Sequence, residues 1–337
     1  MGPGGSQRRD EGRMIGRRTL LAGLAVPAVA RAQGPVAQPA WAPTHSVRIL
    51  VPYGPGGGAD TTARLLAGPM GAVLGQTVVV ENRQGAGASI GAAEVARSAP
   101  DGHTLMMDAM AHLVTPAMMR LPLDYATAFA PLSLVTELPH VLLVPNTSPA
   151  QDLAGLLAYL RGKPGEVAFG TSGNGTAGHL ASVILARRAG LQVLNAPYRG
   201  IGPALQDLIA GRLGFVFATV ASAMPLVRAG TARGIAVSSL VRVPAAPELG
   251  TVAEQGFPGF EMNEWNGLLL PAGTPAPAVA ALSAAVRHAV ADETVRSRIA
   301  ARGAVLVGGD PAGFAAYLAA RRPVIAELVR AEGIKPE

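Results

Sequence analysis

Three glycine-rich loops stand out because each one follows an expected β-strand and precedes an expected helix. They cover residues 52–60, 82–91 and 170–179. Backbone N–H groups at a helix N-terminus carry partial positive charge, which suits a carboxylate or a phosphate. The third loop also contains hydroxyl and amide side chains, which can hydrogen-bond a ligand without adding charge. Because α/β folds bind ligands at the carboxyl ends of their strands, the three loops together predict a site for a small anion.

The first loop allows more than one interpretation. Its glycines could serve only the dihedral angles of a tight turn, with Asp60 as the helix N-cap. Residues 54–59 also fit the dinucleotide pattern G-x-G-x-x-A, and Glu81 ends the next expected strand. An exported NAD(P)-dependent oxidoreductase using this loop is therefore the alternative function. Against it, Asp60 would repel a pyrophosphate, and no acid–base or hydride-transfer set follows in the sequence.

Other catalytic and metal sites find little support. Residues 87–91 match G-x-S-x-G, but seven loop residues separate Ser89 from the preceding strand, whereas a nucleophile elbow follows its strand directly. The six histidines show no metal-binding spacing, and His179, beside the third loop, is the best ligand-binding candidate among them. The absence of cysteine excludes thiolate metal sites and cysteine nucleophiles. We expect no enzyme activity, no catalytic residue, no metal and no cofactor.

The positive charge of the chain lies largely at its N-terminus. The 337 residues carry 28 Lys and Arg against 22 Asp and Glu, a net charge of +6. Six of the arginines fall within the first 32 residues, and the remaining ones form no basic stripe. Only 4% of the residues are aromatic, so few side chains could stack on bases. Nucleic acid is therefore not expected as a partner.

Residues 1–32 read as an export signal. Arg17 and Arg18 precede an uncharged run at 19–30, and the A-x-A pattern at 30–32 predicts cleavage near Ala32. The paired arginines fit a twin-arginine signal and an ordinary secretory signal about equally. Met1 and Met14 are both possible starts. No later segment has 18 uninterrupted apolar residues, so we expect a soluble periplasmic protein.

The rest of the chain alternates β-branched runs with Ala/Leu-rich stretches, which predicts an α/β fold with mostly parallel strands. Residues 33–46 are expected to form a flexible arm. Two extended crossings, near 136–140 and at 244–259, divide the remainder into two lobes with a cleft between them. We expect the first lobe to contain residues 47–138 and 264–337 and the second to contain 139–263. Expected strands lie at 47–51, 78–80, 104–107, 141–144, 167–170, 192–195, 214–217, 234–237 and 268–270.

The order of short motifs resembles the Bug family, the extracytoplasmic solute-binding receptors of tripartite tricarboxylate transporters. The first match is VRILVPY at 47–53, followed by PGG at 55–57. Further matching segments lie at 60–64, 81–87, 99–105, 172–176, 179–181, 197–200, 203–204, 251–254, 258–260 and 271–275. The resemblance covers nearly the whole chain after the leader. It implies a type II-like periplasmic-binding-protein fold with two lobes, which captures a small carboxylate and delivers it to a membrane permease. The receptor is expected to be a monomer.

The resemblance also implies which residues bind the carboxylate. In the first lobe they are Tyr53, Gly56, Gly57, Gly58, Ala86, Gly87, Ala88 and Ser89. In the second lobe they are Thr171, Ser172, Asn174, Thr176, His179, Tyr198 and Thr219. For Tyr198 a purely structural turn is an equal alternative. The sequence departs from the family at Gln84, Ala88, Thr219 and residues 108–112, which leaves the identity of the acid open.

Overall fold

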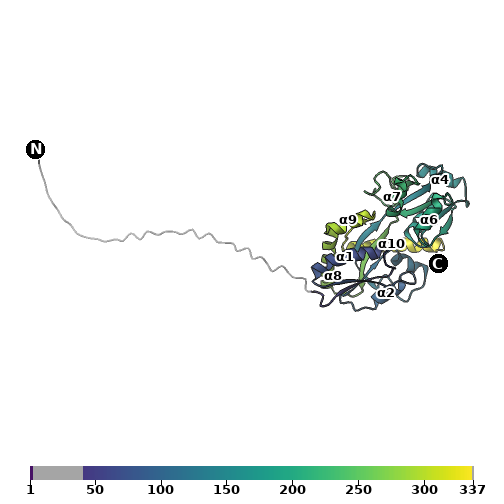
Figure 1. Ribbon diagram of the computed structural model, residues 1–337. Helices are drawn as coiled ribbons and strands as arrows, with labels where there is room; N and C mark the ends of the chain where they lie inside the picture. The colour runs from purple at the N-terminus through teal and green to yellow at the C-terminus, as the bar shows by residue number, and fades with distance from the viewer. Residues whose placement is uncertain (3–40, 336–337) are drawn as a thin grey trace. The chain divides into compact units, whose positions relative to one another are not determined.

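The computed structural model describes residues 1–2 and 41–335, and residues 41–335 lie in one compact unit (Figure 1). The expected export signal and its cleavage position therefore lie outside the described residues. Within the described part of the chain, no helix is long and apolar enough to cross a membrane.

The first of two sheets has six strands in the order β11-β4-β10-β3-β1-β2. Its interior strand β1 (Val47–Val51), next to the edge strand, buries residues on both faces, as its unbroken apolar run after Arg48 requires. β1 pairs in parallel with β2 and β3, whereas β10 pairs antiparallel with β3 and β4. The other strands are β2 (Val78–Asn82), β3 (Thr104–Asp108), β4 (Phe129–Leu138), β10 (Glu264–Pro271) and β11 (Val305–Leu306).

The second sheet has five strands in the order β7-β6-β8-β5-β9. The chain enters it directly from β4, because only Pro139 separates Leu138 from β5. It leaves after β9 through the irregular segment 238–263 and returns to the first sheet at β10. The strands are β5 (His140–Pro145), β6 (Ala168–Thr171), β7 (Leu194–Pro197), β8 (Phe215–Thr219) and β9 (Ala232–Val237).

Helices cover both faces of both sheets. On the six-stranded sheet, α1 and α8 lie side by side over one face (Figure 1). The helices α2, α3 and α10 pack on the other face. On the five-stranded sheet, α6 and α7 cover one face, and α4 and α5 cover the other. The helices are α1 (Gly58–Leu74), α2 (Ser89–Ala96), α3 (Ala111–Met118), α4 (Leu153–Arg161), α5 (Ala177–Ala189), α6 (Ile201–Ile209), α7 (Val220–Arg228), α8 (Ala276–Ala291), α9 (Glu293–Ala301) and α10 (Pro311–Ala331).

One apolar cluster joins the two sheets. It contains Leu50 and Met106 from the first sheet, Phe217 from the second, and buried residues of α3, α5 and α10. Side chains from the two sheets and from these helices therefore pack in one continuous core.

The structure corrects three expectations. The strands are not mostly parallel, because β4, β5 and β10, which connect the two sheets, run antiparallel to their neighbours. Asp60 is not an N-cap, since α1 begins at Gly58 and Gly57 is the N-cap. Residues 41–46 are not a flexible arm: Trp41 packs edge-to-face on His103, whose Nε2 accepts a hydrogen bond from the Thr44 N–H at 3.1 Å.

Candidate ligand site

A cavity of about 480 Å³ lies where loops that follow the two sheets meet. Tyr53 follows β1, Ala86 and Gly87 follow β2, and the residues at 172–176 follow β6. One wall is formed by α3 and its flanking residues. The lining residues are Tyr53, Ala86, Gly87, Ala109, Met110, Ala111, Val114, Thr115, Met118, Met119, Ser172, Gly173, Asn174, Gly175, Thr176 and Glu264. This volume suits a small organic molecule.

Beside the cavity, a buried carboxylate orders Tyr53. The Tyr53 hydroxyl donates a hydrogen bond to Asp108 Oδ1 at 2.6 Å, and the Ala109 N–H donates to the same oxygen at 2.9 Å. The other oxygen of Asp108 lies 3.0 Å from His112 Nδ1. Burial and the neighbouring Asp108 raise the pKa of Tyr53 well above its usual value, so its hydroxyl keeps its proton. Asp108 thus fixes the Tyr53 ring at the edge of the cavity.

Glu264, at the start of β10, adds a second carboxylate that lines the cavity. Its Oε1 accepts hydrogen bonds from the N–H of Met110 at 2.8 Å and of Trp265 at 3.1 Å. Burial is the main cause that raises the pKa of Glu264 to about 7, and the nearby Asp108 raises it further. The two N–H donors favour the ionised form but do not outweigh burial.

The second loop approaches α3 in a strained backbone conformation. Ala86 and Ala88 have φ values of 45° and 73°, in the left-handed region that alanine seldom adopts. The carbonyl of Gly87 between them accepts a hydrogen bond from the Thr115 hydroxyl at 2.8 Å. Such strain is typical of ligand-binding loops.

The third loop is held by its own polar groups at the start of α5. Thr176, the N-cap of α5, donates from its hydroxyl to the Gly173 carbonyl at 2.8 Å and accepts from the His179 N–H at 3.4 Å. The Gly175 N–H donates to His179 Nδ1 at 3.1 Å. His179 therefore supports the loop from behind, while Ser172, Asn174 and Thr176 line the cavity.

The Thr176 hydroxyl offers a test of this support. Replacing Thr176 with alanine is expected to lower the free energy of unfolding by about 1 kcal/mol, because an N-cap acceptor is lost. Thr176→Ser should retain most of the stability, since serine keeps the hydroxyl. Urea unfolding of the three proteins measures the difference, and an equal loss in the serine and alanine variants would mean that the methyl group, not the hydroxyl, matters.

The first loop uses its polar groups internally. Asp60 accepts hydrogen bonds from the Gly56 N–H at 2.9 Å, from Arg64 Nε at 3.0 Å and from Asn82 Nδ2 at 2.9 Å. Burial opposes ionisation of Asp60, but these donors outweigh it and hold its pKa below the usual value. The Gly56 amide, which would face a pyrophosphate in a dinucleotide site, is thus already engaged by Asp60.

The structure brings six of the expected binding residues to the cavity. These are Tyr53, Ala86, Gly87, Ser172, Asn174 and Thr176. Ala88 and Ser89 adjoin this group in sequence. Gly56, Gly57 and Gly58 lie in the first loop and at the start of α1, outside the lining.

The remaining four expected residues also lie outside the lining. Thr171 is fully buried at the end of β6, and His179 supports the third loop. The Tyr198 hydroxyl donates to Asp207 at 2.6 Å, and the Thr219 hydroxyl lies 3.1 Å from that of Ser222.

Sequence reasoning placed residues 108–112 at the cleft wall, and Ala109, Met110 and Ala111 do line the cavity, but it missed the rest of α3 and Glu264. Val114, Thr115 and Met118 line the cavity from α3, a short helix interrupted by Pro116 that gives little sequence signal. Glu264 was visible only as one residue of a segment that returns to the first sheet. An acidic residue next to a buried tryptophan, at the start of a strand, was the available hint.

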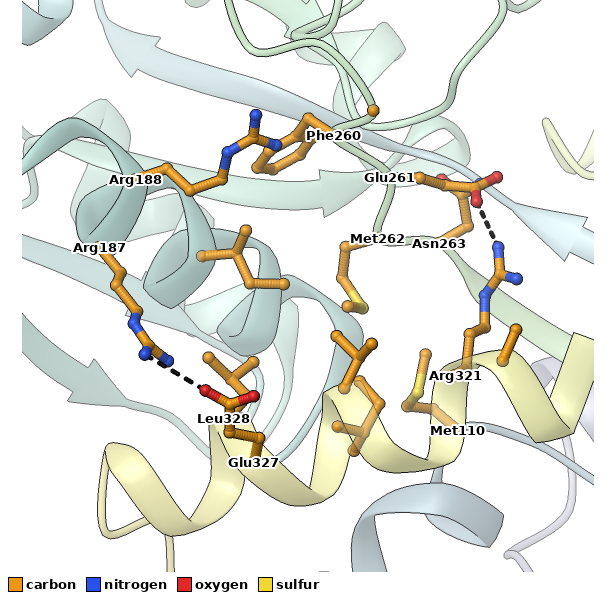
Figure 2. A pocket seen from close by; sticks show the side chains of 15 residues that line it. Met110, Arg187, Arg188, Phe260, Glu261, Met262, Asn263, Arg321, Glu327 and Leu328 are labelled. Carbon is orange, nitrogen blue, oxygen red and sulfur yellow. Dashed lines mark hydrogen bonds and ion pairs between the residues drawn. The ribbon is translucent and has the colours of Figure 1, made fainter.

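A second cavity, of about 470 Å³, lies between α5, residues 259–263 and α10 (Figure 2). Figure 2 shows two ion pairs at its sides, Arg187 with Glu327 at 3.5 Å and Arg321 with Glu261. Arg188 donates to the Pro258 carbonyl at 3.0 Å. The arginines of this cavity are therefore already paired within the protein. It shares Met110 with the first cavity but contains none of the glycine-rich loops.

Comparison with known proteins gives a family for this architecture. Residues 62–321 match the model of the tripartite tricarboxylate transporter family receptor, TctC. The chain is 38% identical over 299 residues to a UPF0065 protein encoded in the tcbD–tcbE intergenic region of Pseudomonas sp. (strain P51). That alignment covers 88% of this chain and 89% of the relative.

Solved structures agree with this assignment. The periplasmic binding protein BugD superposes with a TM-score of 0.71 at 32% identity, covering 88% of this chain and all of BugD. MatC of Rhodopseudomonas palustris with bound malate gives 0.71 at 32% identity, covering 85% of this chain and 99% of MatC. An R. palustris protein with adipate gives 0.73 at 31% identity, covering 88% and 99%. The chain belongs to the TctC/Bug family of periplasmic solute-binding receptors, which are not enzymes.

Proposed function

We propose that this protein is the receptor of a tripartite tricarboxylate-type transporter, which captures a small carboxylated metabolite and delivers it to a membrane permease. The observation that carries the proposal is the 480 Å³ cavity, which is lined by Ala111 at the start of α3, by Thr176, the N-cap of α5, and by the second loop just before α2. Helix N-termini favour anions through their free N–H groups and their dipoles. The malate- and adipate-bound relatives support a carboxylate as the ligand class.

The proposed working step is closure of two lobes on the ligand. The proposed lobes, residues 47–138 with 264–337 and residues 139–263, correspond to the two sheets, and the crossings at Pro139 and before Glu264 would act as hinges. The third loop would close from the second lobe onto the second loop and α3 of the first. A ligand that contacts both sides favours the closed state because it gains more contacts there.

The proposed location is the periplasm, reached by export of a precursor that is cleaved near Ala32. The family membership and the leader pattern at 17–32 support this. We further propose that the receptor acts as a monomer, which leaves the face around the cavity free for the permease.

The binding proposal is tested by thermal shift with a panel of organic acids that includes malate and adipate. At least one acid is expected to stabilise the protein, by about 2.7 kcal/mol at a concentration 100 times its Kd. Mass spectrometry of the compound that co-purifies with the protein would identify the solute directly. Stabilisation by NAD(P) and by no organic acid would contradict the proposal and favour the oxidoreductase alternative.

A further inference from the structure

The described lining of the ligand cavity contains a negatively charged side chain and no positively charged one. Among the described residues that line it, Glu264 is the only one with a charged side chain, and there is neither a lysine nor an arginine. Asp108 lies directly behind, linked to the cavity through the Tyr53 hydroxyl. A ligand that is negative throughout would therefore place its charge near two carboxylates with no arginine or lysine in the lining to offset it.

Of these two carboxylates, only Glu264 has an oxygen left for a ligand. Asp108 is fully buried and accepts from Tyr53 and Ala109, with His112 at 3.0 Å. Both hydrogen bonds that Glu264 accepts from the described residues reach Oε1, from the N–H of Met110 and of Trp265, which leaves Oε2 without one. Because Glu264 lines the cavity, this second oxygen is the free acceptor of the site.

A purely structural role for Glu264 would need one acceptor oxygen but not a negative charge. Through Oε1 the side chain caps α3, since it accepts from the N–H of Met110 at the start of that helix. A neutral glutamine could accept the same bond. A carboxylate partly removed from water, beside another carboxylate and without a counter-ion, is unfavourable unless a cation reaches it or it takes up a proton.

We propose that the solute of this receptor carries a protonated nitrogen, which Glu264 binds through Oε2. Its carboxylate would lie at the N–H groups of the second and third loops. The ligand class is then an amino acid or another amine-bearing acid, and not a purely anionic di- or tricarboxylate. This assignment rests on the proposed function, because it concerns the same cavity.

The test uses pairs of ligands that differ only in the group facing Glu264. Adipate and 6-aminohexanoate have the same span from one carboxylate to the far heteroatom, and malate and aspartate differ by a hydroxyl against an ammonium group. Isothermal titration at pH 8, extended to dicarboxylates and ω-amino acids of three to six carbons, should show the ammonium-bearing member of the preferred pair binding at least tenfold more tightly.

Glu264→Gln separates charge from capping, because glutamine keeps an oxygen for the Met110 N–H. In this variant the preferred amine-bearing acid should lose at least tenfold in affinity. The other member of its pair, which has no ammonium group, should bind equally well or better. Glu248→Gln, at an exposed position of the 244–259 segment, is the matched control and should change neither. Thermal unfolding of each variant confirms that it is folded.

The outcomes distinguish failure of the ligand assignment from failure of the proposed function. Tighter binding of the member without an ammonium group by the unmodified protein, or an unchanged preference in Glu264→Gln, would overturn the assignment and leave Glu264 as a cap of α3. If no acid of either kind bound, the proposed function would fail and the assignment with it.

Discussion

Gly175→Ala is expected to weaken binding of the solute by about 10- to 100-fold. The Cβ of an alanine at this position would lie 2.7 Å from Val114 Cγ1 and 2.9 Å from Met118 Sδ. Gly175 belongs to the third loop, and the other two residues belong to α3, so the added methyl group would push apart the two sides of the cavity. Overpacking of this kind costs about 1–3 kcal/mol. If this cost falls only on the closed state, it corresponds to the expected 10- to 100-fold loss of affinity.

The control for this variant must share its backbone strain. Gly175 has a φ of 76°, and Gly75, the C-cap of α1, has a φ of 67° with no atom near the site of a Cβ. Gly75→Ala should therefore lose about as much stability from the left-handed conformation and leave affinity unchanged. Titration of the same ligand into both variants gives the comparison. Equal affinities in the two would show that the third loop does not need to approach α3 for binding.

Glu264→Gln is expected to make the ligand-free protein more stable at pH 8, by about 1–3 kcal/mol, and to leave its stability unchanged at pH 4.5. In the unfolded chain the Glu264 carboxyl loses its proton near its usual pKa of about 4.3, whereas in the folded protein it keeps the proton up to about pH 7. A raised folded-state pKa contributes stability that is complete below the unfolded value and is lost as the pH rises through 7. Glutamine has no proton to lose, so the difference between the two proteins grows with pH.

Other groups near Glu264 also titrate, so only the difference between variants is informative. Asp108 is the charged group that acts on Glu264 most directly. Asp108 in turn contacts Tyr53 and His112, and Tyr317 on α10 experiences both Glu264 and Arg321. Urea unfolding of the wild type, Glu264→Gln and Glu248→Gln between pH 4.5 and 9 isolates the contribution of Glu264. A constant difference across this range would contradict burial as the cause of the raised pKa.

The local pattern predicted most of the strands and the family. The strand expected at 47–51 is β1, and the expected strands at 104–107 and 141–144 lie within β3 and β5. Short β-branched runs bounded by glycine report such strands because the signal is contained in a few adjacent residues. The family assignment was also confirmed, since its motifs are local and occur in order.

The sequence did not reveal the elements whose role depends on distant partners. β4 was not expected as a strand, although it pairs with both β10 and β11. The helix α3 was also missed, although it forms a wall of the cavity. Both depend on residues more than a hundred positions away, and no local pattern encodes those pairings.

By itself, the sequence determined the class of fold, the family and the three loops that reach the strand ends, because strand periodicity and turn glycines act over a few residues. Only the tertiary structure decided which loop residues line the cavity and which ones serve the fold. In the folded protein the Gly56 N–H donates to Asp60, and His179 accepts from the Gly175 N–H of the third loop. Glu264 accepts from the Met110 N–H at the cavity. The charge of the site is decided at this level, because Glu264 and Asp108 come from strands far apart in the chain and interact only where the sheet brings them together.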